Sequence, residues 1–225
     1  MPAAELLARA PVPDTGKHLS LYREAGGFSI KIAGRGELMN SRVYGSEKAL
    51  AELACEGLAR RRGARVLVGG LGMGFTLAAA LQGLAEDAEV VVAELVPEVV
   101  QWNRDLMGEP AGHPLDDPRS TVRVGDVAEV LRDEPGGFDA ILMDVDNGPE
   151  GIIRRENDWL YTVQGLEATR AALRPGGVLA VWSAGPDRLF TGRLHHAGFK
   201  TEERTVRPHR KGRGARHHIW LARAR

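Results

Sequence analysis

The chain has 225 residues, 43% of them hydrophobic, which suits one α/β domain with a modest extension. Lys and Arg total 30 and Asp and Glu total 30, so the net charge supports neither nucleic acid nor membrane as a partner. The single cysteine, Cys55, excludes an intramolecular disulfide and fits a reducing cytoplasm. Residues 1–13 lack the pattern of a secretory signal and no window is long and apolar enough to span a membrane, so we expect a soluble, cytoplasmic protein.

The N-terminal 45 residues predict a small β-unit that precedes the main domain. Three prolines within residues 1–18 favour a loose lead-in. Alternating apolar segments around glycine turns then predict three strands, at Leu19–Arg23, Phe28–Ile32 and Glu37–Asn40. Ser46 is expected to N-cap a helix that runs to about Arg61. We therefore expect two units, residues 1–45 and residues 46–225.

A glycine-rich turn follows the first strand of the main unit. Val66–Val68 is a short apolar run, glycines stand at 69, 70, 72 and 74, and Leu77–Leu84 favours a helix. The start of a helix offers free N–H groups to a ligand, and glycines let the backbone approach it closely. The pattern predicts a nucleoside-binding turn formed by Gly70, Gly72 and Gly74.

Two acidic strand ends support the same interpretation. The strand Glu89–Leu95 contains Glu94 about 20 residues after the turn, where Rossmann-like folds place a carboxylate that binds ribose hydroxyls. The strand Thr121–Val124 is followed by Gly125 and Asp126, which suit the edge of an adenine. Each carboxylate could instead be solvated or cap a helix.

The rest of the chain alternates strands and helices, which predicts a mostly parallel sheet covered on both faces. Pro97 fits the first turn of a helix. The later elements are expected at Phe138–Asp144, about Leu160–Leu173, Val178–Trp182, near Arg188–His196, about Lys200–Val206 and about His217–Ala222. The last two strands are joined by a basic turn and predict an antiparallel hairpin rather than another crossover.

A sheet that ends in such a hairpin resembles the Rossmann-like class I S-adenosylmethionine-dependent methyltransferase fold over about Gly63–Ala224. Within that fold the chain resembles more closely the spermidine synthase (polyamine aminopropyltransferase) family, whose members act in polyamine biosynthesis. The shared features are the N-terminal β-unit, the glycine-rich turn, the acidic strand end, the Gly-Asp pair and a strand that ends in an acidic, proline-bounded loop. The matching segments of this chain are Leu19–Asn40, Gly69–Gly74, Glu94, Gly125-Asp126, Asp144–Glu150, Trp159–Tyr161 and Leu173–Gly177.

The resemblance implies transfer of an aminopropyl group from decarboxylated S-adenosylmethionine to a small-molecule amine, without a metal. Attack on a sulfonium requires a neutral amine, whereas an aliphatic ammonium with a pKa of about 10 is almost wholly protonated at neutral pH. Asp144 is the expected catalytic group, because a carboxylate at the end of a core strand can take that proton. The resemblance also implies that the amine acceptor is bound by Tyr44, Glu47, Asp146, Glu150 and Tyr161. It further implies a possible homodimer.

Two departures from the family pattern leave alternatives open. The glycine-rich turn carries Leu71, Gly72 and Met73 where spermidine synthases usually have an Asp that recognises the amine of the donor. The junction Tyr44–Glu47 lacks the usual His of the family. A methyltransferase that uses S-adenosylmethionine on a small molecule is therefore one alternative. A non-catalytic binding module of the same fold is the other.

The paired histidines do not predict a metal site. His195 and His196 are adjacent, as are His217 and His218. Adjacent side chains on a helix or strand point in different directions, and no cysteine or spaced carboxylate completes a tetrahedral set.

Overall fold

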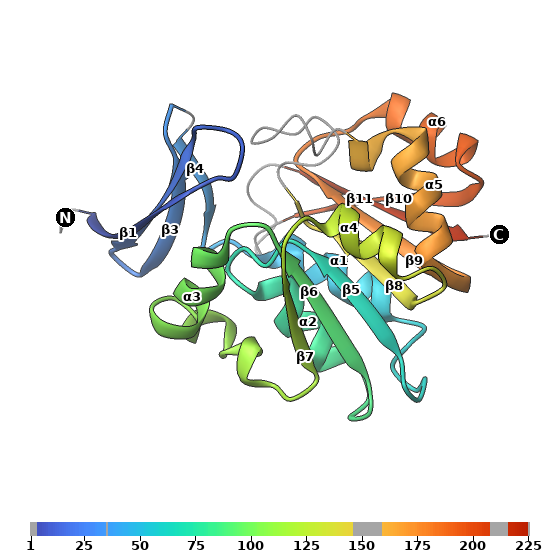
Figure 1. Cartoon of the computed structure of the whole chain (residues 1–225), viewed down its shortest axis with the longest axis horizontal. Helices are drawn as coiled ribbons and strands as arrows, with labels where there is room; N and C mark the ends of the chain where they lie inside the picture. Colours follow the sequence, from blue (N-terminus) through green and yellow to red (C-terminus); the bar gives the residue numbers. More distant parts are fainter. Residues whose placement is uncertain (1–3, 35, 146–158, 208–215, 225) are drawn as a thin grey trace.

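The computed structural model describes residues 4–34, 36–145, 159–207 and 216–224. Within these residues the strands form a four-stranded and a seven-stranded sheet, and the small sheet lies beside one end of the large one (Figure 1). None of the described helices combines the length and the apolar composition that crossing a membrane requires. The predicted division into residues 1–45 and 46–225 follows the boundary between the two sheets and stays a prediction.

The small sheet is an antiparallel meander in the order β1-β2-β3-β4. Its strands are β1 (Glu5–Pro11), β2 (His18–Glu24), β3 (Gly27–Ile32) and β4 (Gly36–Asn40). The predicted hairpin and third strand are confirmed. The predicted loose lead-in is wrong, because β1 pairs with β2 from Glu5 opposite Arg23 to Pro11 opposite His18. Proline is tolerated at Pro11 because it ends an edge strand, where a missing N–H costs little.

The large sheet has the strand order β10-β11-β9-β8-β5-β6-β7. Its strands are β5 (Arg65–Gly69), β6 (Glu89–Glu94), β7 (Ser120–Val124), β8 (Phe138–Met143), β9 (Leu173–Ser183), β10 (Phe199–Val206) and β11 (His217–Ala224). The five neighbouring strands β7, β6, β5, β8 and β9 are parallel. Strand β11 pairs antiparallel with both β9 and β10. The predicted parallel sheet and C-terminal hairpin are confirmed. The strand expected at Val178 begins earlier, because Leu173 pairs with Phe138 before a shift in register.

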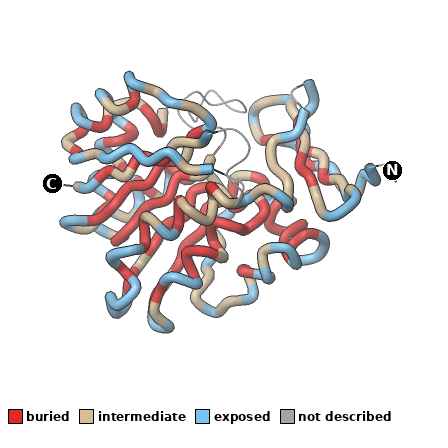
Figure 2. The backbone as a smooth tube through the Cα atoms, turned by 180° about the vertical axis from the view of Figure 1, so that it is seen from behind, coloured by how far each residue is buried: buried red, intermediate tan, exposed pale blue. Residues whose placement is uncertain are grey.

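Helices cover both faces of the large sheet. They are α1 (Gly45–Cys55), α2 (Phe75–Gly83), α3 (Pro97–Asp105), α4 (Val127–Asp133), α5 (Val163–Ala172) and α6 (Arg188–His196), with short 3-10 turns η1 (Glu109–Ala111) and η2 (Pro114–Asp116). Successive residues of β5 point to opposite faces of the sheet. Val66 and Val68 pack in the same cluster as α1, α2 and α3, whereas Leu67 packs with α4, α5 and α6. The central strands are accordingly buried along most of their length (Figure 2).

Three helix predictions require correction. Ser46 does not cap α1, because Tyr44 occupies the N-cap position and Ser46 is buried inside the first turn. That helix ends at Cys55 rather than near Arg61. The helix expected from Leu160 begins at Val163, where the Thr162 hydroxyl accepts a hydrogen bond from Gly165. In addition, α4 was not predicted, since its seven residues are too few for a clear period.

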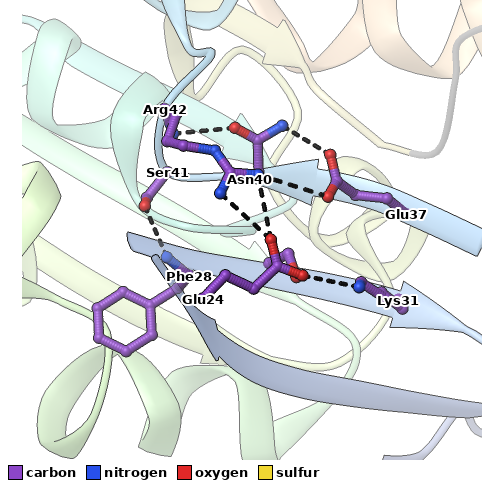
Figure 3. Close-up of polar contacts among 8 residues, drawn as sticks. Glu24, Phe28, Lys31, Glu37, Asn40, Ser41 and Arg42 are labelled. Atoms are coloured by element: carbon purple, nitrogen blue, oxygen red, sulfur yellow. Dashed lines mark hydrogen bonds and ion pairs between the residues drawn. The ribbon is translucent and has the colours of Figure 1, made fainter. Parts of the chain in front are cut away.

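The small sheet is tied to the start of α1 by a cluster of charged side chains around Glu24 (Figure 3). The Glu24 carboxylate accepts hydrogen bonds from Lys31 at 2.7 Å, from Ser29 at 2.9 Å and from Arg42 at 3.2 Å. These bonds, that of Lys31 foremost, lower the pKa of Glu24 to about 2. Arg42 belongs to the segment that leads from β4 into α1, so the cluster fixes where that segment leaves the sheet.

Replacing Glu24 by Gln should destabilise the protein by about 1 kcal/mol at neutral pH, because Lys31 and Arg42 lose a charged acceptor. Since the pKa of Glu24 is lower in the folded state than its ordinary value of 4.5, its contribution is complete above about pH 5 and is lost as the pH falls towards about 2. Urea unfolding of wild type and Glu24→Gln over this range measures the effect. Glu5→Gln, which removes an exposed partner of Arg23, is the control and should change stability little. A Glu24→Gln difference that persists at about pH 2 would contradict the prediction.

Candidate active site

The glycine-rich turn lies at the carboxyl end of β5, where open α/β sheets bind ligands. Gly70, Gly72 and Gly74 all have positive φ angles, of +88°, +51° and +82°. A Cβ atom on Gly70 would lie 2.6 Å from the carbonyl oxygen of Asp144, a backbone atom that cannot turn aside. Glycine is therefore required at Gly70 by backbone conformation and by space together.

Glu94 is the last residue of β6 and is buried beneath this turn. Its Oε2 accepts a hydrogen bond from the Leu71 N–H at 3.0 Å, and its Oε1 accepts one from the Val96 N–H at 2.9 Å. Burial raises the pKa of Glu94, while these backbone N–H groups act in the opposite direction. The backbone N–H groups of Gly72 and Leu95 lower its pKa as well, so Glu94 holds the turn in place through several backbone contacts while it lines the pocket described below.

Gly125 and Asp126 follow β7 and join it to α4. The Gly125 N–H donates to the Glu94 carbonyl at 2.9 Å. Asp126 is the N-cap of α4, and its Oδ1 accepts a hydrogen bond from the Ala128 N–H at 2.8 Å. Asp126 thus caps a helix, which is the alternative role raised from the sequence. The expected contact of Asp126 with an adenine stays a prediction.

A pocket of about 110 Å³ brings several predicted residues together. Gly70, Gly72, Glu94 and Asp144 contribute to its lining from the large sheet. The small sheet and its flanks supply an apolar wall made of Val12, Leu19, Ile30, Leu38 and Met39. The described residues that line this pocket do not include Gly125 or Asp126. The small sheet thus closes one side of the ligand edge of the large sheet, which its sequence did not reveal.

Asp144 follows β8 directly and is held by one side chain and one backbone group. The Thr76 hydroxyl of α2 donates to Asp144 Oδ2 at 2.5 Å, and the Asp144 N–H donates to the Gly69 carbonyl at 2.9 Å. The residue keeps some accessible surface because it lines the pocket, although protein surrounds its carboxyl group. Burial and repulsion by Glu47 raise the pKa of Asp144 to about 7, against the effect of Thr76. The group can therefore exchange a proton near neutral pH.

Glu47 lies in the first turn of α1 and is joined to the far end of the chain. Ser46 Oγ donates to Glu47 Oε2 at 2.6 Å, and His217 Nδ1 lies 2.9 Å from the same Ser46 oxygen. Burial raises the pKa of Glu47. Burial, followed by the charge of His218, lowers the pKa of His217. The structure thus brings the Glu47 carboxyl group and the His217 imidazole close to Asp144, which lines the pocket.

The structure places the two predicted tyrosines differently. Tyr44 is 41% exposed and stacks on Phe75, with ring centroids 4.2 Å apart. Tyr161 is buried, packs edge-on against Phe190, and donates from its hydroxyl to the Val145 carbonyl at 3.2 Å. Tyr161 therefore holds the backbone beside Asp144. The predicted residues Asp146 and Glu150 lie outside the described residues.

Sequence reasoning missed Thr76, Ser46 and His217 as members of this site. Thr76 had one available signal, because it lies in the first turn of the helix that follows the glycines. Ser46 and His217 are 171 positions apart in the chain, and no local pattern relates them.

The Cys55 thiol is buried, and burial raises its pKa to about 12, which makes it a poor nucleophile. Within the described ranges, no group of three or more His, Cys, Asp or Glu side chains is arranged to hold a metal ion.

The strand order, the glycine-rich turn and the acidic strand ends define the class I S-adenosylmethionine-dependent transferase fold. A family profile of the spermine/spermidine synthase domain matches residues 54–190, more than half of the chain. The chain therefore belongs to the spermine/spermidine synthase family.

Curated relatives agree with this family. The chain is 34% identical over 120 residues to polyamine aminopropyltransferase 2 of Pseudomonas aeruginosa, a match that covers 52% of this chain and 32% of the relative. It is 30% identical over 101 residues to the polyamine aminopropyltransferase of Mycobacterium tuberculosis, covering 44% of this chain and 18% of the relative. The matches thus span a third or less of the length of these relatives.

Solved structures share the fold. Spermidine synthase from Thermotoga maritima superposes with a TM-score of 0.72 at 17% identity, covering 97% of this chain and 72% of the other. A probable spermidine synthase from Corynebacterium glutamicum gives a TM-score of 0.65 at 20% identity, covering 100% of this chain and 81% of the other. A third neighbour, with a TM-score of 0.71 and 17% identity over 97% of this chain and 72% of its own, is a spermidine synthase in complex with the transition state analogue AdoDATO.

Proposed function

We propose that this protein transfers an aminopropyl group from decarboxylated S-adenosylmethionine to an amine. The observation that carries the proposal is Asp144: a carboxyl group with a pKa of about 7 stands beside the glycine-rich turn at the ligand edge of the sheet. Such a group can accept a proton from a substrate ammonium near neutral pH. Family membership and the names of the relatives point to the same chemistry.

The reaction needs one proton acceptor and one well-placed donor carbon. Asp144 takes a proton from the acceptor ammonium, and the freed nitrogen lone pair attacks the carbon bonded to the sulfonium. The C–S bond breaks and its electron pair goes to sulfur, which becomes a neutral thioether, while the nitrogen becomes a secondary ammonium. Much of the remaining rate comes from holding nitrogen, carbon and sulfur in line.

Each part of the site has a role in this proposal. Glu94 binds the ribose hydroxyls, the glycine-rich turn lets the backbone approach the donor, and Gly125 with Asp126 takes the adenine edge. The apolar wall from the small sheet excludes water from the sulfonium. The proposed acceptor contacts are Tyr44, Glu47, Asp146, Glu150 and Tyr161. A homodimer and a cytoplasmic location belong to the same proposal.

Calorimetry with the two donors tests the proposal. Because the turn carries Leu71, Gly72 and Met73 in place of an Asp, its side chains do not choose between the two donors by charge, and their affinities have to be compared directly. We expect decarboxylated S-adenosylmethionine to bind at least about tenfold more tightly than S-adenosylmethionine, a difference of about 1.4 kcal/mol. The reverse preference would make the protein a methyltransferase. Binding of neither would favour a non-catalytic module.

Replacing Thr76 by Val should shift the pH dependence of the reaction. The Thr76 hydroxyl stabilises the ionised form of Asp144, so its removal should raise the pKa of Asp144 above about 7, by about one unit. The acidic limb of the kcat/KM profile then moves to higher pH: activity falls several-fold near pH 7 and recovers near pH 9. Thr169→Val, which removes a buried hydroxyl bonded to the Gly165 carbonyl in α5, is the control and should leave the profile in place. A profile of Thr76→Val that overlays the wild type would refute the pKa assignment.

A further inference from the structure

A row of polar side chains leads away from the catalytic carboxyl. Glu47 is near enough to Asp144 for the two carboxyl groups to repel. Ser46 Oγ lies 2.6 Å from Glu47 Oε2, and His217 Nδ1 lies 2.9 Å from Ser46 Oγ. The row therefore runs from the pocket, through the first turn of α1, to the start of β11.

The topology of the sheet explains why His217 reaches this place. The strands β5 to β9 are parallel and end at the ligand edge, whereas β11 is antiparallel to β9 and begins there. The first residue of β11 is thus brought to the edge that carries Asp144. The indole of Trp182 meets the His217 ring edge-on at 4.8 Å, which holds the imidazole facing Ser46.

The proposed transfer requires a path by which a proton can leave Asp144. An ammonium and a sulfonium enter, and a secondary ammonium and a neutral thioether leave, so each turnover releases one proton. Asp144 receives that proton while enclosed by protein and substrate. It must lose the proton before it can act again, and bulk water does not surround its carboxyl group.

We propose that Glu47, Ser46 and His217 relay the proton from Asp144 to solvent, an inference that rests on the proposed function. Asp144 gives its proton to the Glu47 carboxylate with which it interacts, Glu47 passes a proton to Ser46 Oγ while the Ser46 proton moves to His217 Nδ1, and a proton leaves the imidazolium from Nε2. Afterwards Glu47 is a carboxylate, Ser46 donates to it, and His217 loses its charge to water. The observed hydrogen bond from Ser46 to Glu47 has the polarity of the state that follows the transfer.

The titratable groups near His217 are few among the described residues. Glu47 approaches through Ser46 on α1, and His218 is the neighbour along β11. His218 points to the other side of the strand and bonds to Glu203 of β10 at 2.6 Å. His218 is therefore a matched control: it lies in the same strand and is the same residue type, but its hydrogen bond to Glu203 lies outside the row.

Three variants of the full chain test the relay. His217→Asn keeps a hydrogen-bonding group near the Nδ1 position but cannot carry a proton at neutral pH. We expect it to lower kcat by about tenfold or more, with donor affinity unchanged by calorimetry. His217→Ala should lose as much and recover with added imidazole. His218→Asn should keep wild-type kcat. Wild-type kcat in His217→Asn, or a loss in His217→Ala that imidazole does not restore, would overturn the relay.

A titration followed by NMR separates this inference from the proposed function, because it needs no turnover. The imidazole signals of His217 and His218 are followed against pH in wild type and in Glu47→Gln. If the row is connected, loss of the Glu47 charge lowers the pKa of His217 and leaves that of His218 in place. An unchanged His217 titration would overturn the relay whether or not the protein transfers an aminopropyl group. A shifted titration in a protein that transfers none would refute the proposed function alone.

Discussion

Replacing Asp144 by Asn should lower kcat by about 10²–10⁴-fold while donor affinity stays within about twofold of wild type. Asn has nearly the same shape but cannot accept a proton from the acceptor amine. Thr76 can still donate to the side-chain oxygen, so the turn and its contact through the Gly69 carbonyl should persist. Steady-state transfer and donor calorimetry on the same preparation measure the two effects.

The same variant should be more stable than wild type at alkaline pH. The pKa of Asp144 is raised in the folded state from its ordinary value of 3.8 to about 7, so wild-type stability declines as the pH rises from about 4 to above 7. The amide that replaces the carboxyl group does not ionise, which removes both the burial cost and the repulsion by Glu47. Unfolding of both proteins at about pH 5 and pH 8.5 tests the sign. Full turnover in Asp144→Asn would remove the catalytic assignment, and equal stability at pH 8.5 would remove the electrostatic one.

Replacing Gly70 by Ala should abolish donor binding and destabilise the fold by about 3 kcal/mol or more. Part of this cost is the left-handed backbone, since φ is +88° at Gly70. The larger part is contact of the new Cβ with the Asp144 carbonyl at 2.6 Å, which the backbone must move to relieve. That movement displaces both the turn and Asp144, the proposed proton acceptor.

Gly26→Ala is the matched control for this substitution. Gly26 has φ of +87°, almost the same as Gly70, but a Cβ atom there would meet nothing within 4 Å. It should cost only about 1 kcal/mol and leave donor binding intact. Urea unfolding and donor calorimetry on the two variants separate strain from contact. Equal costs in both would mean that the crowding at Gly70 has no effect.

Much of the fold could be predicted because its signals are local. The glycine-rich turn, the alternation of strand and helix, and the final hairpin each lie within one stretch of sequence, and the structure confirms them. The wrong predictions arose where contacts with distant residues decided the structure against the local amino-acid composition. Residues 5–11 form β1 despite nearby prolines because β2 supplies a partner for their backbone groups. Ser46, a good cap by residue type, is instead buried within the helix.

By itself the sequence determined the fold class, the glycine-rich turn at Gly70–Gly74 and the positions of Glu94 and Asp144 at strand ends. Each follows from short-range rules of backbone conformation and strand direction. Only the tertiary structure decided which side chains meet near Asp144, because Thr76 and Glu47 come from two separate helices and His217 reaches Glu47 through Ser46 from a distant strand. The raised pKa of Asp144 depends on that enclosure and on the nearby carboxylate. Such proximity arises from packing between distant segments, for which no local pattern of residues is a sufficient signal.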